Sequence, residues 1–271
     1  MKKVFDTNEE YHAHNSISAS GLKSIVELKG SVREYLARTY KYNSAFHFGN
    51  AIHTLLLEGR KKYEAEYYEL PEIGQLRKTE TTTTEEAAAN RKLKEQLLTK
   101  AGNKSVIDFK DVQTIREIER QFYAKPIAVA SCKGEAELSH YAEFGGIPVR
   151  VRPDCVNYEE NWISDVKSTK DVINFKKDIY NYNYHVQAAF YCSVLGIPIE
   201  NFRFIAVKNN MQYDNPEHPE TMVRVVKLND EMIDKGFELM YWAFDRWKHY
   251  VNTGVALGVD AKVDELGIEI L

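Results

Sequence analysis

Cysteine is scarce in this chain, and its spacing excludes two kinds of small crosslinked structure. The 271 residues include three cysteines, which lie far apart in the sequence: Cys132, Cys155 and Cys192. An odd number of widely spaced cysteines argues against a disulfide framework, and it cannot supply a four-cysteine cluster or zinc site. We therefore expect the fold to be stabilised by a hydrophobic core and not by crosslinks.

Long apolar runs are also missing. No run approaches the ~20 apolar residues that a membrane-spanning helix needs. The opening segment, MKKVFDTNEE, contains two lysines but no apolar stretch, so we expect no signal peptide. Together these absences predict a cytoplasmic protein with no membrane association.

An excess of positive charge is the third absence. The chain has 36 Lys and Arg against 40 Asp and Glu, a formal net charge of −4. Any contact with a polyanion must therefore depend on a local basic surface. Hydrophobic residues, by contrast, make up 44% of the chain and include 17 Tyr and 12 Phe. This is enough to fill the core of one large α/β domain or two small ones.

The first part of the chain, residues 1–130, has mainly helical patterns. Apolar residues recur at helical spacing over residues 44–58, and Gly59 is a plausible terminator. Residues 78–89 are low in complexity and lack an apolar stripe, which predicts an exposed loop running into a helix. A further helix is expected to begin near Asp108.

The second part, residues 131–271, has strand patterns broken by two helical stretches. A helix is expected after the third strand, and a long amphipathic helix from Asp230. The predicted strands are residues 136–144, 147–156, 162–168, 201–209 and 221–228. We expect a single domain over residues 1–271, with a sheet core in its second part.

Charged residues lie inside two of these predicted strands. If residues 147–156 and 162–168 pair, alternation places Arg150, Arg152 and Asp154 on one face of the first strand. Ile163, Asp165 and Lys167 likewise share a face of the second strand. Two carboxylates and an ammonium then converge, and Mg²⁺ prefers such oxygen ligands. The alternative is a surface hairpin with a cross-strand ion pair.

Three further residues are candidates for the same site. His53 lies on an apolar helical stretch, where a histidine is usually packed in a core or interface, although an imidazole can also complete a metal site. Gln187 and Tyr191 are four residues apart, so they share a helix face. An amide beside a phenol suits contact with a phosphate or a base edge. The alternative for both is packing.

Taken in order, four motifs resemble those of a known nuclease group. They are GNAIHTLLLE, RPD, DVKST and HVQAAFY. They resemble the RecE-like phage and prophage exonucleases of the PD-(D/E)xK superfamily, whose active site is similar to that of the RecB nuclease domain. The resemblance extends from about Tyr11 to the last helix. It implies an α/β PD-(D/E)xK fold, with a central mixed sheet flanked by helices and a helical N-terminal elaboration.

The resemblance also implies roles for individual residues. His53, Asp154, Asp165 and the carbonyl of Val166 would hold Mg²⁺, for which Mn²⁺ can substitute. Lys167 would position the attacking water. Some relatives add an acidic residue on the preceding strand, and here Glu135 and Glu137 are equal candidates.

Other residues are implied to complete catalysis and to contact DNA. Gln187 and Tyr191 would complete the catalytic set and touch the DNA. Ser168 and Thr169 would contact a phosphate. Basic residues near the site would supply the local positive charge, with Lys23, Lys29 and Arg33 along the approach and the following closest to the site: Arg150, Arg152, Lys170, Lys176 and Lys177.

The activity that the resemblance implies is a metal-dependent exodeoxyribonuclease. It would degrade linear double-stranded DNA from 5′ to 3′ in phage-type recombination, in the cytoplasm of a bacterial host. Its partners would be DNA ends, a single-strand annealing protein and copies of itself in a ring. The alternatives are a non-catalytic DNA-binding module of the same fold, or an endonuclease. A Cas4-like iron–sulfur nuclease would need four clustered cysteines, which this chain lacks.

Overall fold

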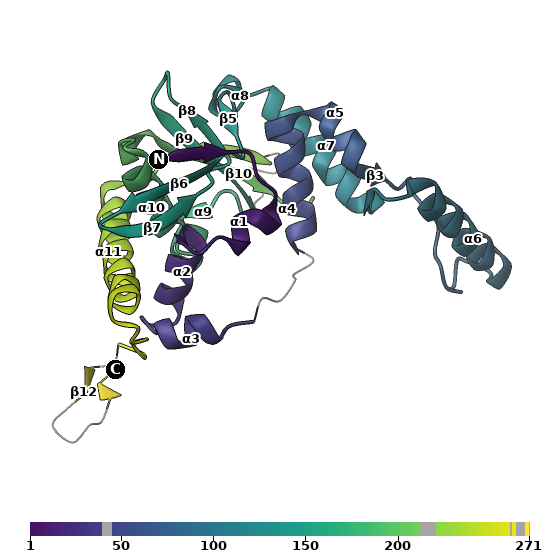
Figure 1. Cartoon of the computed structure of the whole chain (residues 1–271). Helices are drawn as coiled ribbons and strands as arrows, with labels where there is room; N and C mark the ends of the chain where they lie inside the picture. Colours follow the sequence, from purple (N-terminus) through teal and green to yellow (C-terminus); the bar gives the residue numbers. More distant parts are fainter. Residues whose placement is uncertain (40–44, 212–220, 261, 264–268, 271) are drawn as a thin grey trace.

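The computed structural model describes residues 1–39, 45–211, 221–260, 262–263 and 269–270. Within these residues the chain is a mixed α/β structure whose sheets are flanked by helices (Figure 1), which confirms the expected fold class. In the described ranges, no helix combines the length and apolar character needed to cross a bilayer.

A five-stranded mixed sheet forms the centre of the molecule. Its strand order is β11-β10-β9-β8-β5. The central pair, β9 and β10, is parallel, whereas β8 and β11 run antiparallel to their neighbours. The bounds are β5 (Glu135–Ala136), β8 (Cys155–Asn157), β9 (Trp162–Thr169), β10 (Phe202–Lys208) and β11 (Val223–Val226).

A second sheet of four strands lies beside the first, in the order β1-β6-β7-β2. Gly145 and Gly146 make the turn between β6 and β7, with φ angles of 55° and 81° that favour glycine. The bounds are β1 (Lys2–Val4), β2 (Ile17–Ser18), β6 (Ser139–Phe144) and β7 (Ile147–Val151). Strands from the first 20 residues are therefore part of the sheet core.

The single strand expected over residues 147–156 is wrong, because two strands in two different sheets occupy this range. β7 ends at Val151 and β8 begins at Cys155. Pro153 lies between them, and proline cannot donate a ladder hydrogen bond. The hairpin with β9 is therefore shorter than predicted, and Asp154 lies at the junction between the two sheets.

Helices cover both faces of the central sheet. Alternation along β10 divides its side chains, so that Phe204 and Ala206 pack in one core and Ile205 and Val207 in the other. The first core is closed by α2 (Ala19–Glu27), α9 (Phe175–Asn181), α10 (Tyr184–Leu195) and α11 (Asp230–Thr253). The second is closed by α4 (Ala45–His53), the π-helical segment η1 (Thr54–Glu58), α5 (Arg60–Glu66), α7 (Phe109–Tyr123) and α8 (Pro126–Ser131).

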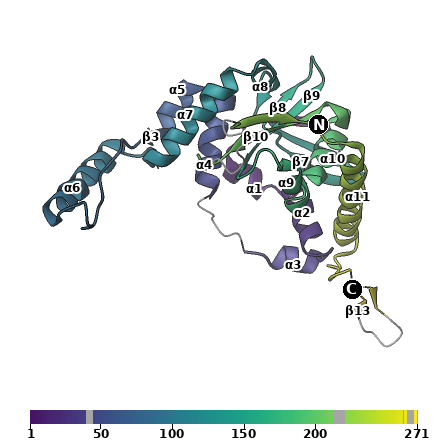
Figure 2. The ribbon, with the colours of Figure 1, turned by 180° about the vertical axis from the view of Figure 1, so that it is seen from behind.

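Figure 2 shows α6 reaching away from the sheets. The remaining elements of the structure are α1 (Asn8–Ala13), α3 (Val32–Ala37), β3 (Tyr67–Glu69), α6 (Thr84–Ala101), β4 (Ser105–Ile107), the 3-10 turn η2 (Ile199–Asn201), β12 (Lys262–Val263) and β13 (Glu269–Ile270).

Two helical predictions for the first part of the chain can be compared with the structure. The loop running into a helix that was expected over residues 78–89 is confirmed, and the helix begins after Thr83, where Thr83 and Glu86 form a capping box that starts α6. The helix expected over residues 44–58 is divided into α4 and η1. It ends at Gly59 as predicted, where φ is 91°, while residue 44 lies outside the described residues.

We expect Phe204→Ala to destabilise the fold strongly. Phe204 is fully buried at the centre of β10, where its ring packs against Phe175, Tyr184 and Phe202. Removing a buried aromatic ring costs about 3–5 kcal/mol of unfolding free energy. Urea unfolding followed by circular dichroism measures the loss. Phe5→Ala is the matched control, since Phe5 is 77% exposed and its loss should change the unfolding free energy little; equal stability of the two variants would contradict the packing described here.

Candidate active site

The site is organised by a stretch of β9 that, within the described residues, pairs with a strand on one side only. β8 pairs with β9 only up to the register Cys155–Ser164. Beyond that point the Val166 N–H donates to Asp154 Oδ2 at 2.6 Å, and the Val166 carbonyl oxygen lies 3.0 Å from His53 Nε2. Buried backbone groups require such partners. The strand edge thus fixes two of the predicted site residues.

His53 brings together two carboxylates. It is the last residue of α4, at the point where the helix changes to the π-helical segment. Its Nε2 lies 3.6 Å from Asp154 Oδ2, and its Nδ1 lies 3.6 Å from Glu137 Oε1. Glu135, the other acidic candidate, points elsewhere and pairs with Lys3 at 3.3 Å. Of the two candidates, the structure therefore places Glu137 at the site.

The protonation of His53 reflects these neighbours. Burial by itself lowers the pKa of the imidazole, but the charges of Asp154 and Glu137 outweigh burial and raise it to about 9. Burial raises the pKa of Asp154, despite the nearby charges of His53 and Lys167. The raised pKa favours the charged imidazolium beside these two carboxylates.

Asp165 lies on the other side of the strand edge and is almost fully buried. Its Oδ1 accepts a hydrogen bond from the Lys167 ammonium, and its Oδ2 accepts one from Gln187 Nε2 at 2.5 Å. Burial raises the pKa of Asp165, and the charge of Asp154 adds to that rise. Burial acts to lower the pKa of Lys167, but the two aspartates raise it, so the ammonium stays charged.

α10 contributes Gln187 and Tyr191 from one side, as their spacing predicts. Gln187 reaches Asp165 directly, whereas the Tyr191 hydroxyl donates to the Arg152 carbonyl oxygen at 3.1 Å. Tyr191 thus holds the segment that leads to Asp154. Lys23 also belongs to this group, because its Nζ lies 3.3 Å from Gln187 Oε1. The sequence predicted Lys23 only along the approach to the site.

The two arginines predicted to contact DNA have other partners in the structure. Arg150 is buried and donates to the carbonyl oxygens of His14 and Ser16. The Arg152 guanidinium forms an ion pair with Asp6 at 2.5 Å, with the side chains of both residues largely buried. Both arginines thus join the N-terminal segment to β7 and its continuation, and DNA contact by them stays a prediction.

The polar residues at the end of β9 are placed differently from one another. The Thr169 hydroxyl donates to Asp178 Oδ2 at 2.5 Å. Ser168 lies opposite Gly49 of α4, and Lys170 is exposed just beyond the strand. A role in phosphate binding stays a prediction for Ser168, Thr169 and Lys170.

The donor set suits a hard divalent cation. One nitrogen or oxygen atom each from His53, Glu137 and Asp154 lie within 4.8 Å of one another. Asp165 and the carbonyl of Val166, on the same strand, would add oxygen ligands, and carboxylate and carbonyl oxygens are the donors that Mg²⁺ and Mn²⁺ prefer. The residues therefore fit the predicted metal.

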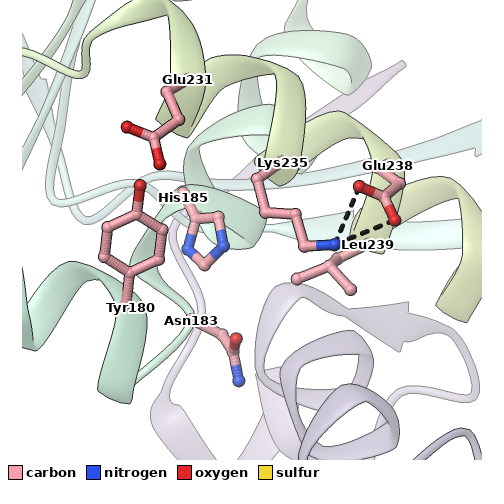
Figure 3. Close-up of a pocket in the computed structure, with 7 residues that line it drawn as sticks. All are labelled: Tyr180, Asn183, His185, Glu231, Lys235, Glu238 and Leu239. Atoms are coloured by element: carbon pink, nitrogen blue, oxygen red, sulfur yellow. Dashed lines mark hydrogen bonds and ion pairs between the residues drawn. The ribbon is translucent and has the colours of Figure 1, made fainter.

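A separate cavity of about 480 Å³ lies between α10 and α11 (Figure 3). His185, Lys235 and Glu238 are among its lining residues. His185 and Gln187 are two positions apart on a helix, so they project from opposite sides of α10. None of the carboxylates around His53 lines this cavity, and it is distinct from the candidate active site.

Among the solved structures that are similar to this one, two are described as exonucleases. A protein described as a "putative exonuclease" from Eubacterium rectale has a TM-score of 0.56 at 14% identity, over 93% of this chain and 88% of that chain. A phage-related exonuclease from Haemophilus somnus has a TM-score of 0.36 at 12% identity, over 92% of this chain and 100% of the other. Only the first score is high enough to bear on the fold. No curated protein matched the chain.

A family model described as a PDDEXK-like domain of unknown function matches residues 18–255. The matched range contains every residue of the site, from Lys23 on α2 to Tyr191 on α10. The resemblance to the PD-(D/E)xK superfamily drawn from the four motifs is thereby confirmed. By this match over most of its length, the chain belongs to the family of PDDEXK-like domains designated DUF3799.

Proposed function

We propose that this protein is a metal-dependent exodeoxyribonuclease that degrades linear double-stranded DNA. The observation that carries the proposal is the convergence of Asp154, Asp165 and Lys167 at the open edge of β9, with His53 and Glu137 beside them. Membership in the PDDEXK-like family supports it. The E. rectale structure with the same fold, described as a "putative exonuclease", favours exonuclease activity.

The buried charges argue against a non-catalytic module. Asp154 and Asp165 are both almost fully buried, and burial raises the pKa of each carboxyl group. Two buried carboxylates close together destabilise a fold unless a bound cation or a partner offsets them. A module that only bound DNA would need none of these carboxylates. Their retention supports a catalytic site.

Each residue has a distinct chemical task in this proposal. A divalent ion held by His53, Asp154, Asp165 and the Val166 carbonyl would supply Lewis acidity toward the phosphate and a more acidic water. The Lys167 ammonium, fixed by Asp165, is placed to orient the attacking water and to balance charge that develops on the phosphate. Gln187 holds the second oxygen of Asp165 and so limits the rotation of that carboxylate.

The finer assignments rest on the motifs that resemble RecE-like exonucleases. They are 5′-to-3′ polarity, Mg²⁺ as the physiological ion, action in phage-type recombination with a single-strand annealing protein, and assembly into a ring. The net charge of −4 gives the chain no overall attraction to DNA. A ring would supply positive charge locally, because copies around a channel bring their basic residues together.

Linear duplex DNA should be degraded in the presence of Mg²⁺ or Mn²⁺, while closed circular DNA is largely spared. The test uses linear duplex labelled at the 5′ or the 3′ end, with a closed circle of the same sequence as control. Immediate release of the 5′ label as mononucleotide would establish the polarity. Efficient cutting of the circle would indicate an endonuclease instead, and stability of all DNA with either metal would favour the binding module.

Substitutions of Asp165 and Lys167 should impair the enzyme in different ways. Asp165→Ala removes a metal ligand, so metal binding and cleavage should be lost together. Lys167→Ala keeps the carboxylates, so it should bind metal and DNA but cleave slower by about 10²–10⁴-fold, the usual range for a positioned acid–base group. Calorimetric metal titration and single-turnover cleavage measure both effects, with Lys235→Ala on α11 as the matched lysine control. A folded Lys167→Ala variant that cleaves at the wild-type rate would refute the assignment.

His53→Ala should raise the Mg²⁺ concentration needed for activity while the fold survives. The reason is that the imidazole lies within 3.6 Å of carboxylate oxygens of Asp154 and Glu137, where it would act as a ligand. Metal titration beside a melting curve separates this role from packing. His249→Ala, which removes an exposed imidazole from α11, serves as control. A lower melting temperature with an unchanged metal requirement would assign His53 a packing role only.

A further inference from the structure

A second lysine lies beside the catalytic group without a place in the mechanism above. Lys23 is on α2, a helix that starts where the Ser18 hydroxyl accepts a hydrogen bond from the Gly21 N–H at 3.3 Å. Leu22 and Ile25, on either side of it in the sequence, are fully buried in the core. The helix is therefore firmly anchored, and the direction of Lys23 toward α10 is set by packing.

The ammonium of Lys23 lies close to two residues at the active site, Gln187 and Tyr184. Its Nζ lies 3.3 Å from Gln187 Oε1. It also lies 5.2 Å from the centroid of the Tyr184 ring, and the Nζ of Lys167 lies 5.2 Å from the same centroid. Two ammonium groups thus gather around one aromatic ring, next to the carboxylate of Asp165.

The charges around Lys23 favour an anion beside it. Lys167 repels it, while Asp165 and Glu27 attract it from a distance. The oxygens of Asp165 already accept from Lys167 and Gln187. Over the described residues, no carboxylate is in ion-pair contact with Lys23. Burial and the charge of Lys167 accordingly lower the pKa of Lys23 to about 8. An incoming anion between the two lysines would relieve this repulsion.

We propose that Lys23 binds a DNA backbone phosphate together with Lys167, at or next to the bond that is cut. This inference rests on the proposed nuclease function and assigns a substrate contact within it. Lysine is a compact cation that suits a phosphate oxygen, and a partly desolvated site strengthens the attraction. Gln187 and the Tyr184 ring hold the ammonium in place before substrate arrives.

The same contact gives Lys23 a second effect on the site. An ammonium can only donate hydrogen bonds, so it selects the carbonyl oxygen of the Gln187 amide. The amide nitrogen is then directed at Asp165, as the structure shows. Loss of Lys23 would therefore remove a phosphate contact and also free the Gln187 amide to rotate. The two effects are separable, because only the first depends on salt.

The test compares Lys23→Met, which keeps the aliphatic stem, with Lys23→Arg, which keeps the charge. Lys235→Met on α11 is the matched control, because Lys235 lines the separate cavity and not the candidate active site. Binding of a fluorescent linear duplex is measured by anisotropy without divalent metal, so that DNA stays intact, over a series of KCl concentrations. One lost phosphate contact lowers the slope of log K against log salt by about 0.9. We expect this lower slope for Lys23→Met only. The same variant should have at least tenfold lower kcat/KM in Mg²⁺. Melting curves verify that each variant is folded.

Each other outcome overturns the inference. An unchanged salt slope with lower kcat in Lys23→Met would mean that Lys23 only positions Gln187. Wild-type behaviour of Lys23→Met in both assays would show that Lys23 has no role in DNA binding or cleavage. An equally reduced salt slope in Lys235→Met would show a non-specific effect of charge. Failure of the proposed function has a different signature: the wild-type protein would bind the duplex and leave it intact in Mg²⁺, whatever the salt slopes of the variants.

Discussion

The rest of the site depends on the backbone of Val166, which pairs with a strand on one side only among the residues that the structure describes. β8 begins only at Cys155 because Pro153 interrupts the run that precedes it, and this leaves an N–H and a carbonyl of β9 to be satisfied by side chains. Asp154 accepts the N–H and His53 meets the carbonyl. A regular ladder at this point would have paired Val166 with a strand and excluded both side chains. The gap in the sheet therefore creates the site.

Two hydrophobic cores hold that gap rigid from opposite faces. His53 on α4 lies on the face of the sheet that contains Ile205 and Val207. Gln187 on α10 lies on the opposite face, which contains Phe204. The catalytic side chains are thus carried by elements packed on both sides of a single parallel strand pair. This arrangement explains how buried carboxylates with raised pKa values persist, since packing prevents the site from relaxing to expose them to water.

Several site residues could be predicted from the sequence because their spacing has a direct geometric meaning. Asp165 and Lys167 share a strand face, and Gln187 and Tyr191 share a helix face, whichever way the strands connect. The role of Tyr191 could not be read in the same way. Its hydroxyl holds the Arg152 carbonyl, a contact between residues 39 positions apart that no local pattern encodes. Arg150 and Arg152 were grouped with the site by alternation, yet the N-terminal segment engages both.

The sequence by itself determined most element types, the ordered motifs and the family to which they point, because these depend on local periodicity and residue chemistry. Only the tertiary structure decided which carboxylates meet. Glu135 and Glu137 are equivalent in sequence, but the backbone of Glu137 has a φ of 52° and hydrogen bonds to Asp154, which turns its side chain toward His53. Lys23 likewise joined the site only through the packing of α2 against α10. Contacts between distant segments depend on how helices and sheets dock, and that docking is fixed by the shapes of whole cores.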